Sequence, residues 1–303
     1  MWFWLSLATL ICWSGSDVFS KIGCRDADDK NSHLKMVMAV GLVMGLHAAY
    51  EVFVVGTEIS MEIILTYLPV SLLYIGSMVM GYAGLRYIEL SISSPICNSS
   101  GALVAVVTFL VFGLSDYSPL AIAAVGLVCV GAIGLGVVDF MEDDELRLER
   151  QKESNYVYSK SWIAIALPVA YCILDAIGTF ADNRVLELIA DEASANVAYE
   201  LTFLAAGIVS FIYVALIKKE RIVPKAEAPK YAGAICETAG QFAYIFAIAD
   251  TEHLAMSAPI ISSYCAASVL WSRIFLKEKL SKKHYLMIVL VVAGIAIMGL
   301  LDM

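Results

Sequence analysis

Residues 141–160 read MEDDELRLERQKESNYVYSK, and ten of these twenty residues are charged. No other segment of the 303-residue chain is both as long and as polar. About 140 mostly apolar residues lie on each side of it, and each side divides into five apolar runs. We therefore expect a solvated linker, 141–160, between two similar units, residues 1–140 and 161–303.

The composition of the chain is that of an integral membrane protein. Apolar residues make up 60% of it and charged residues only 16%, and the mean hydropathy is +0.78. Soluble domains carry roughly 45–50% apolar and about 25% charged residues. The formal net charge of −9, without a basic stripe interleaved with aromatic residues, argues against a nucleic-acid partner.

Motifs for enzymatic chemistry are missing from the sequence. The seven cysteines are scattered, and no pair has the CxxC or Cys/His spacing of a metal site. There is no Walker motif and no dinucleotide fingerprint. We therefore expect no enzymatic activity, no cofactor and no bound metal.

Each apolar run is long enough to cross a bilayer as a helix, which takes about 20 residues for about 30 Å of hydrocarbon. Continuous runs of this length exclude a β-barrel, whose strands alternate over about ten residues. The expected fold class is an all-α integral membrane protein with ten transmembrane helices. Their expected ranges are 2–22, 34–55, 63–86, 91–113, 118–139, 161–182, 195–217, 229–249, 254–275 and 283–301.

Basic residues indicate how these helices cross the membrane. The odd-numbered loops and the helix ends beside them hold 19 of the 20 Lys and Arg residues, and only Arg184 falls on the other side. Positively charged loops remain in the cytoplasm. We expect a multi-pass protein of a bacterial-type inner membrane, with the odd loops and the linker in the cytoplasm and both termini outside.

The two halves repeat one another in sequence. A Trp–Asp spacing and a Ser-Pro motif recur in the same order: Trp4 and Asp17 with Trp162 and Asp175, and LSISSPI at 90–96 with LAMSAPI at 254–260. Because each half has five expected spans, the second copy must be inverted in the membrane. Inverted repeats place a binding site near the middle of the membrane, between the halves.

These features resemble those of the drug/metabolite transporter superfamily, in its ten-helix EamA form. The resemblance is carried by WSGSDVFSK at 13–21, AGLRYI at 83–88, the Ser-Pro motifs and the glycines of the fifth and tenth runs. It implies a central cavity lined by helices one, three, four, six, eight and nine. It also implies a small polar cargo, such as an amino acid, an amine, a choline-like cation, a nucleotide or a sugar phosphate. Many members begin in the cytoplasm, whereas the charge pattern places this N-terminus outside.

Acidic residues inside the expected spans are the main functional signal, because a charged side chain costs roughly 2.5–3.5 kcal/mol at a helix centre. They are Asp17, Glu51, Asp175, Glu200 and Glu237. Such residues are protonated, paired, near an interface or facing a water-filled cavity. No comparable set of basic residues lies in the spans, so we expect several of these acids to face a cavity that binds a cation or a proton.

Asp17 and Asp175 occupy equivalent positions of the repeat, so the inversion places them on opposite sides of the midplane. We interpret them as substrate-binding carboxylates, one in each vestibule of the cavity. The alternative is that Asp17 bonds the neighbouring hydroxyls of Ser14, Ser16 or Ser20 and only orders its own helix.

Glu237, Gln241 and Tyr244 follow at intervals of four and three residues, so they share one face of a helix. A carboxylate, an amide and a phenol on one face suit a hydrogen-bonding substrate. The alternative is a polar clamp between helices, worth about 0.6 kcal/mol on average. We predict all three as substrate-binding residues, and Glu237 as the first candidate for proton coupling.

Further proton-coupling candidates are Asp17, His47, Glu51 and Glu200. His47 and Glu51 lie four residues apart, and imidazole titrates near neutral pH. The alternative for this pair is a satisfied hydrogen bond within one helix. The alternative for Glu200 is that its side chain simply reaches the membrane surface.

Prolines in the fourth and ninth spans mark a further part of the site. Pro95 and Pro259 each remove a helical hydrogen bond and free a carbonyl, near Asn98 in one span and Tyr264 in the other. We predict Asn98 and Tyr264 as substrate-binding residues. The alternative is that the kinks serve packing alone.

Aromatic side chains near the acids complete the expected site. An aromatic face attracts an ammonium group by about 2 kcal/mol or more when the pair is desolvated. We predict Trp13, Tyr82 and Tyr171 as substrate-binding residues. The alternative is ordinary helix packing.

These features predict a secondary active transporter of a small amine-bearing cation or zwitterion, such as a choline-like compound, a polyamine or an amino acid. It would be coupled to protons and would work by alternating access. Its partners are then the substrate, protons and the bilayer. The GxxxG of Gly41 and Gly45 is a close-packing surface, either within the bundle or between the subunits of a homodimer. The alternatives are a channel or scramblase-like protein without coupling, and an intramembrane enzyme.

Overall fold

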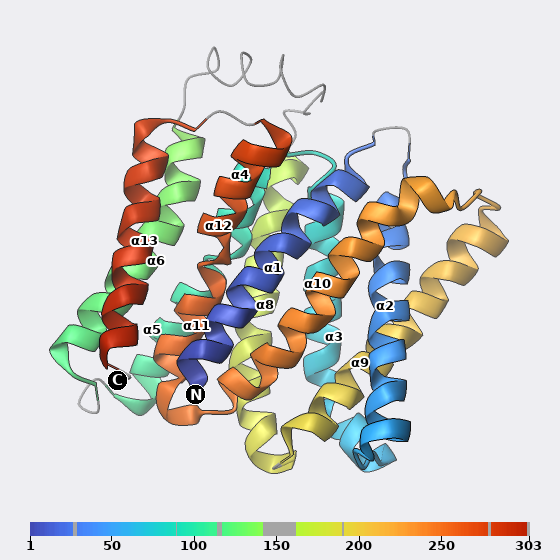
Figure 1. Ribbon diagram of the computed structural model, residues 1–303, viewed down its shortest axis with the longest axis horizontal. Helices are drawn as coiled ribbons and strands as arrows, with labels where there is room; N and C mark the ends of the chain where they lie inside the picture. The colour runs from blue at the N-terminus through green and yellow to red at the C-terminus, as the bar shows by residue number, and fades with distance from the viewer. Residues whose placement is uncertain are drawn as a thin grey trace.

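The computed structural model describes residues 1–26, 29–88, 90–113, 117–141, 162–189, 191–277 and 280–301, and their side chains except at 139, 140, 162 and 164. The expected linker, 141–160, lies outside the described residues from position 142 onward. Every regular element in the described part of the chain is helical, and the helices stand side by side in one bundle (Figure 1).

The helices follow the order of the expected spans. The first half contains α1 (Trp2–Cys24), α2 (Ser32–Tyr50) continued by η1 (Glu51–Val55), α3 (Met61–Gly84), α4 (Leu90–Cys97), α5 (Ser100–Phe112) and α6 (Pro119–Phe140). The second half contains α8 (Trp162–Ile189), α9 (Glu192–Phe211) with η2 (Ile212–Ile217), α10 (Pro224–Ile248), η3 (Thr251–His253), α11 (Leu254–Ser262), α12 (Tyr264–Trp271), η4 (Ser272–Leu276) and α13 (Lys282–Leu301).

Eight helical runs in the described residues have the length and composition needed to cross a membrane. The helices outside this set are α1 and α10, which are 23 and 25 residues long and therefore lack the apolar composition rather than the length. These two helices pack along one another and carry Asp17 and Glu237. The prediction of an all-helical, multi-pass membrane protein is confirmed, and the arrangement as ten spans in two inverted repeats stays a prediction.

The largest difference from the expected ranges is in the sixth span. The sequence predicts a helix over 161–182, whereas α8 continues to Ile189. Beyond Asp182, the apolar residues Val185, Leu186 and Ile189 keep a helical spacing and pack into the core. The polar residues Asp182, Asn183 and Arg184 thus lie inside this helix and do not end it.

Both Ser-Pro spans are interrupted, but each break follows its proline by three or four residues, and Pro95 and Pro259 themselves lie inside α4 and α11. The first breaks at residues 98–99, between α4 and α5, and the second breaks at Ser263, between α11 and α12. The amide of Ser99 donates to the carbonyl of Pro95 at 3.1 Å, and the amide of Ser263 donates to that of Pro259 at 2.9 Å. At both breaks, a serine amide thus donates to the carbonyl of the proline four residues earlier.

The two halves of the chain are interleaved rather than separate. Helix α1 packs along α10 and against α11 and α12, all from the second half. Helix α8 packs along α3 and against α4 and α5, all from the first half. In Figure 1, α1 lies beside α10 and α12, two helices of the second half. Any cavity between the halves is therefore bordered by helices from both.

Helices α2 and α9 come into close contact at Gly41. A Cβ atom there would lie 2.7 Å from the carbonyl oxygen of Phe203 and 3.0 Å from the Cα of Gly207, so only glycine allows this approach. The GxxxG face of Gly41 and Gly45 therefore packs inside the protein, against α9. A homodimer stays a prediction, and this face does not supply its interface.

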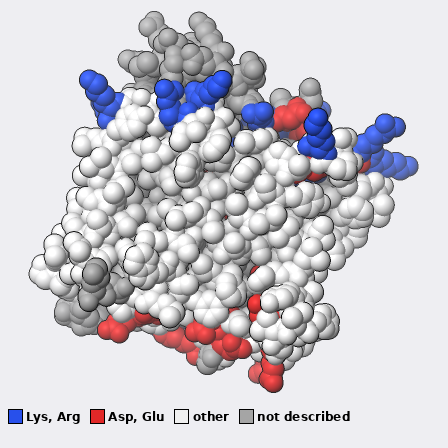
Figure 2. All heavy atoms as spheres, viewed as in Figure 1, with Lys and Arg blue, Asp and Glu red and all other residues white. Residues whose placement is uncertain are grey.

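Lys and Arg gather at one end of the bundle, with some acidic residues among them, and Asp and Glu gather at the other end (Figure 2). We call one end the basic end, which carries Lys218, Lys219, Arg221, Lys282 and Lys283. We call the other the acidic end, which carries Glu58, Glu62, Glu187, Asp191 and Glu252. Both chain termini lie at the acidic end (Figure 1), as the even number of expected spans requires.

Two lysines that the charge pattern assigns to cytoplasmic loops are buried in an ion-pair network at the basic end. Lys35 Nζ lies 2.9 Å from Asp29 and 3.3 Å from Glu220. Lys230 Nζ lies 2.6 Å from Glu227 and 3.8 Å from Asp29. This network joins α2, α10 and the loops before them.

Candidate functional site

A cavity of about 700 Å³, counting its open mouth, lies inside the bundle. We call it the main cavity. It is lined by side chains of α1, α3, α4, α8, α9, α10 and α12. Eight of the ten predicted substrate-binding residues line it: Trp13, Asp17, Tyr82, Tyr171, Asp175, Glu237, Gln241 and Tyr264.

Helical periodicity explains why these residues meet. On α1, Trp13, Asp17 and Ser20 are spaced by four and three residues, so they share a face. On α8, Tyr171 and Asp175 are one turn apart and share a face in the same way. Since α1 and α8 are each packed among helices of the other half, both polar faces point to the interior.

Asp17 is held by hydroxyls from two distant helices. Ser94 on α4 donates to its Oδ2 at 2.5 Å, and Ser268 on α12 donates to the same oxygen at 2.7 Å. Of the alternative partners on α1, Ser14 donates to the carbonyl of Ile11 at 2.8 Å and Ser20 donates to the sulfur of Met36 at 3.8 Å. The carboxylate therefore ties α1 to α4 and α12 through one oxygen, Oδ2.

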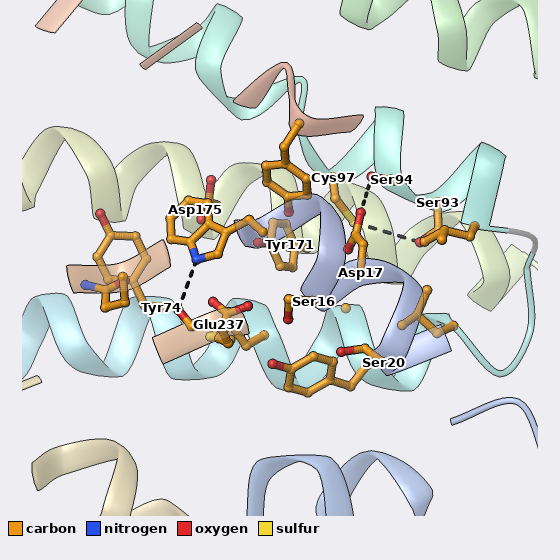
Figure 3. Close-up of a pocket in the computed structure, with 18 of the residues that line it drawn as sticks. Ser16, Asp17, Ser20, Tyr74, Ser93, Ser94, Cys97, Tyr171, Asp175 and Glu237 are labelled. Carbon is orange, nitrogen blue, oxygen red and sulfur yellow. Dashed lines mark hydrogen bonds between the residues drawn. The ribbon is translucent and has the colours of Figure 1, made fainter. Parts of the chain in front are cut away.

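Trp13 and Glu237 are joined across the α1–α10 contact. The indole Nε1 of Trp13 donates to the carbonyl oxygen of Glu237 at 3.3 Å (Figure 3). The indole ring packs on Gly240, where a Cβ would lie 2.4 Å from ring atom Cδ1. Its other neighbours are the rings of Tyr244 and Tyr264, with centroids 5.0 and 5.8 Å away.

The main cavity has an acidic lining without a basic counterpart. Asp17, Asp175 and Glu237 surround one space in Figure 3. No Lys or Arg is among the described residues that line it. Carboxylates are costly in a membrane interior unless they are neutralised, so this lining favours protons or a cationic ligand.

The remaining two predicted residues, Asn98 and Tyr244, line a smaller chamber, whose empty space is about 340 Å³ when the gaps between its lining side chains and its open side are counted. Trp13, Tyr171 and Tyr264 border both this chamber and the main cavity, so aromatic rings separate them. The amide of Asn98 donates to the carbonyl of Ser94 at 2.8 Å. Asp175 also borders both spaces.

A buried network of hydroxyls around Asp182 lies between the chamber and the acidic end. Tyr67 and Tyr74 donate to the two oxygens of Asp182 at 2.7 and 3.1 Å. The hydroxyl of Tyr74 lies 2.5 Å from that of Tyr244, and Tyr244 donates to Thr179 at 3.1 Å. We call this network of Asp182, Tyr67, Tyr74, Tyr244 and Thr179 the tyrosine closure.

Asp182 and Tyr67 are functional candidates that the sequence interpretation missed. Asp182 is fully buried, and it follows Asp175 and Thr179 on the same helical face. That stripe was the available signal, but the expected span ended at residue 182. Tyr67 offered no signal, since a tyrosine in an apolar run is usually a packing residue.

At the basic end of the bundle, a buried lysine of α1 binds backbone carbonyls at the end of α3. Lys21, 1% exposed, donates to the carbonyl oxygens of Leu85 at 2.6 Å and Ile88 at 2.8 Å. The fully buried Asn183 makes a similar contact near the acidic end, where it donates to the carbonyl of Ile248 at 2.7 Å. A side chain of α1 thus binds the C-terminal end of α3, and a side chain of α8 binds the C-terminal end of α10.

Three proton-coupling candidates form a cluster of their own outside the main cavity. His47 Nδ1 lies 2.8 Å from Glu200 Oε1, and Asn196 donates to the same oxygen at 3.0 Å. His47 Nε2 lies 3.8 Å from Glu51, which instead accepts from Thr57 at 2.8 Å. Histidine therefore pairs across helices with Glu200, and Glu200 is buried rather than reaching the surface.

Comparison with known proteins gives one family and one fold. Residues 161–300 match the EamA-like transporter family. A solved structure titled "Crystal structure of protein" is 13% identical, with a TM-score of 0.62 over 98% of this chain and 96% of that one. This likeness shows a shared fold along almost the whole chain. No curated protein sequence matches the chain.

Proposed function

We propose that this chain, whose residues 161–300 match the EamA-like transporter family, is a secondary active transporter of small amine-bearing cations. It moves its substrate across a cell membrane through the main cavity. The observation that carries this proposal is a cavity with three carboxylates and no lining Lys or Arg among the described residues.

The aromatic lining supports a cation as the substrate. Trp13, Tyr171 and Tyr264 border the space that Asp17, Asp175 and Glu237 surround. An ammonium group held by a carboxylate and an aromatic face gains from both ion pairing and cation–π attraction, worth about 2 kcal/mol or more when desolvated. The phosphate of a sugar phosphate or nucleotide would be repelled by these three carboxylates.

Alternating access is supported by separate contacts near the two ends of the cavity. The tyrosine closure lies toward the acidic end, and Lys21 joins α1 to the α3–α4 connection at the basic end. Breaking one set while the other stays formed would open the cavity to one side at a time. Under the positive-inside rule the basic end is cytoplasmic, both termini are outside, and the membrane is a bacterial-type inner membrane.

Glu237 is the proposed coupling residue. Its carboxylate lies in the cavity beside Ser16 (Figure 3), so a proton and an ammonium group would compete for it. The substrate would enter when the proton leaves, and the reverse step would follow on the other side. The pair of His47 and Glu200 is a second place for a proton, outside the substrate path.

The test is uptake of a labelled organic cation into proteoliposomes with an imposed pH gradient. We expect saturable, gradient-dependent uptake, and loss of gradient dependence in Glu237→Gln. Glu62→Gln, which neutralises an exposed carboxylate of α3 outside the cavity, is the matched control and should behave as wild type. Proton-dependent uptake by Glu237→Gln would remove this residue from the mechanism, and non-saturable flux would favour the channel alternative.

A further inference from the structure

Two donors that line the main cavity have no acceptor in the part of the chain that the structure describes. The amide nitrogen Nε2 of Gln241 and the hydroxyl of Tyr82 are buried without a hydrogen-bond partner among the described residues. Gln241 is 3% exposed and Tyr82 is 7% exposed, so bulk water does not replace the missing partners. Native proteins leave few buried polar groups unsatisfied, and at a cavity the missing partner can be a water, an ion or an acceptor atom of a ligand.

The lining therefore makes two different demands on a ligand. The carboxylates of Asp175 and Glu237 need a positive donor, whereas Gln241 and Tyr82 need an acceptor. A ligand with only an ammonium group would satisfy the acids and leave both donors unpaired. Leaving a buried donor unpaired costs free energy that a suitable oxygen atom on the ligand would recover.

The acceptor on the ligand must be neutral. A ligand carboxylate would approach three acidic side chains in a low-dielectric site with no lining Lys or Arg among the described residues. A carbonyl or ester oxygen accepts a hydrogen bond from an amide or a phenol without adding charge. The zwitterionic form of an amino acid is therefore disfavoured.

The spacing between the carboxylate of Glu237 and the amide of Gln241 fits a short ligand. Gln241 lies four residues after Glu237 on α10, so the two side chains start ~6 Å apart along one helical face. An amine and a carbonyl oxygen separated by a few bonds reach both. Tyr82 lies on α3 and can approach the same oxygen from another side of the cavity.

We propose that the substrate is a cationic amine that carries a neutral carbonyl oxygen close to the nitrogen, as in an amino-acid amide or ester. Its ammonium group binds Glu237 and Asp175, and its carbonyl oxygen accepts from Gln241 and Tyr82. The apolar lining at Met78 and Leu90 favours an aliphatic substituent. This proposal rests on the proposed function and narrows its substrate class.

The experiment measures dissociation constants of four probes for the purified full-length protein near neutral pH. Leucinamide has the ammonium group and the neutral carbonyl, and leucine has the ammonium group with a carboxylate. 3-Methylbutylamine has the ammonium group alone, and 4-methylpentanamide has the amide alone. We expect leucinamide to bind at least about tenfold more tightly than each of the other three.

Variants test the proposed carbonyl site separately from the proposed transport of amine-bearing cations. Gln241→Met keeps the size of the side chain and should weaken leucinamide about tenfold while leaving 3-methylbutylamine unchanged. Tyr82→Phe removes a single oxygen, so it should keep the fold, and it should shift the preference in the same direction. Glu237→Gln should weaken both amines.

Equal binding of leucinamide and 3-methylbutylamine, or tightest binding of leucine, would overturn this proposal and leave a cation transporter standing. A preference for leucinamide that survives both Gln241→Met and Tyr82→Phe would also overturn it. Failure of every amine to bind would overturn the proposed function itself, and this proposal with it.

Discussion

Asp182 on α8 accepts a hydrogen bond from Tyr67 on α3, with 2.7 Å between Oδ1 and the hydroxyl oxygen, in a fully buried position. Its second oxygen accepts from Tyr74. A carboxylate with two phenol donors can hold both only while each oxygen is an acceptor. We conclude that Asp182 is the central acceptor of the tyrosine closure.

Replacing Asp182 by Asn should weaken this closure, because the new amide nitrogen cannot accept from a tyrosine. The smaller chamber should then open more often toward the acidic end. A cysteine at Ser262, which lines that chamber, should react severalfold faster with a membrane-impermeant maleimide added to intact cells, in a background without the native cysteines. Glu187→Gln on the same helix is the control, and equal rates in the two variants would contradict a closing role.

Gly240→Ala should displace Trp13. The added methyl group would overlap the indole ring, so Trp13 would lose its contact with the carbonyl of Glu237. We expect at least about tenfold weaker cation binding, measured by calorimetry. Gly126→Ala is the matched control, since a Cβ there meets no atom within 4 Å and alanine is the better helix former by about 1 kcal/mol. Unchanged binding in Gly240→Ala would show that the position of Trp13 is unimportant.

Lys230→Met should destabilise the protein, because it leaves Glu227 and Asp29 with fewer partners in a buried network. Breaking a buried pair from one side costs about 3–5 kcal/mol, and we expect the lower part of this range since Lys35 remains 3.9 Å from Glu227. The comparison is Glu187→Gln, which breaks a half-exposed pair with Arg184 and should cost about 0–1 kcal/mol. Thermal unfolding in detergent measures both, and similar midpoints would show that the network adds no stability.

The orientation can be tested with one cysteine at each end of the bundle. A membrane-impermeant label added to intact cells should reach Glu58→Cys at the acidic end and miss Lys219→Cys at the basic end. The reason is the concentration of Lys and Arg at the basic end, which the positive-inside rule assigns to the cytoplasm. The opposite labelling pattern would reverse the orientation.

The helices and the cavity acids could be predicted because both stand out locally. An apolar run of twenty residues needs no partner to be recognised, and acids such as Asp17 and Glu237 are conspicuous inside it. Pro95 and Pro259 mark the interrupted spans by the same local logic. Most of the site residues that we predicted line one cavity in the structure.

Contacts between residues far apart in the chain could not be predicted from the sequence. Ser268 gives no sign that its hydroxyl reaches Asp17, because serine is common in membrane helices as a packing residue. Lys35 and Lys230 count as loop charges in a linear pattern, although the fold neutralises them against acids from three segments. The unpaired donor of Gln241 likewise emerges only when its surroundings are known.

The placement of α1 among α10, α11 and α12, and of α8 among α3, α4 and α5, bears on whether either half could be stable alone. If the two halves are inverted copies of one unit, as the sequence predicts, each half has placed its first helix among the helices of the other. Neither half would then be stable alone, because its first helix would have lost its packing partners. Expressed as two separate polypeptides, the halves should accumulate in the membrane only when they are produced together.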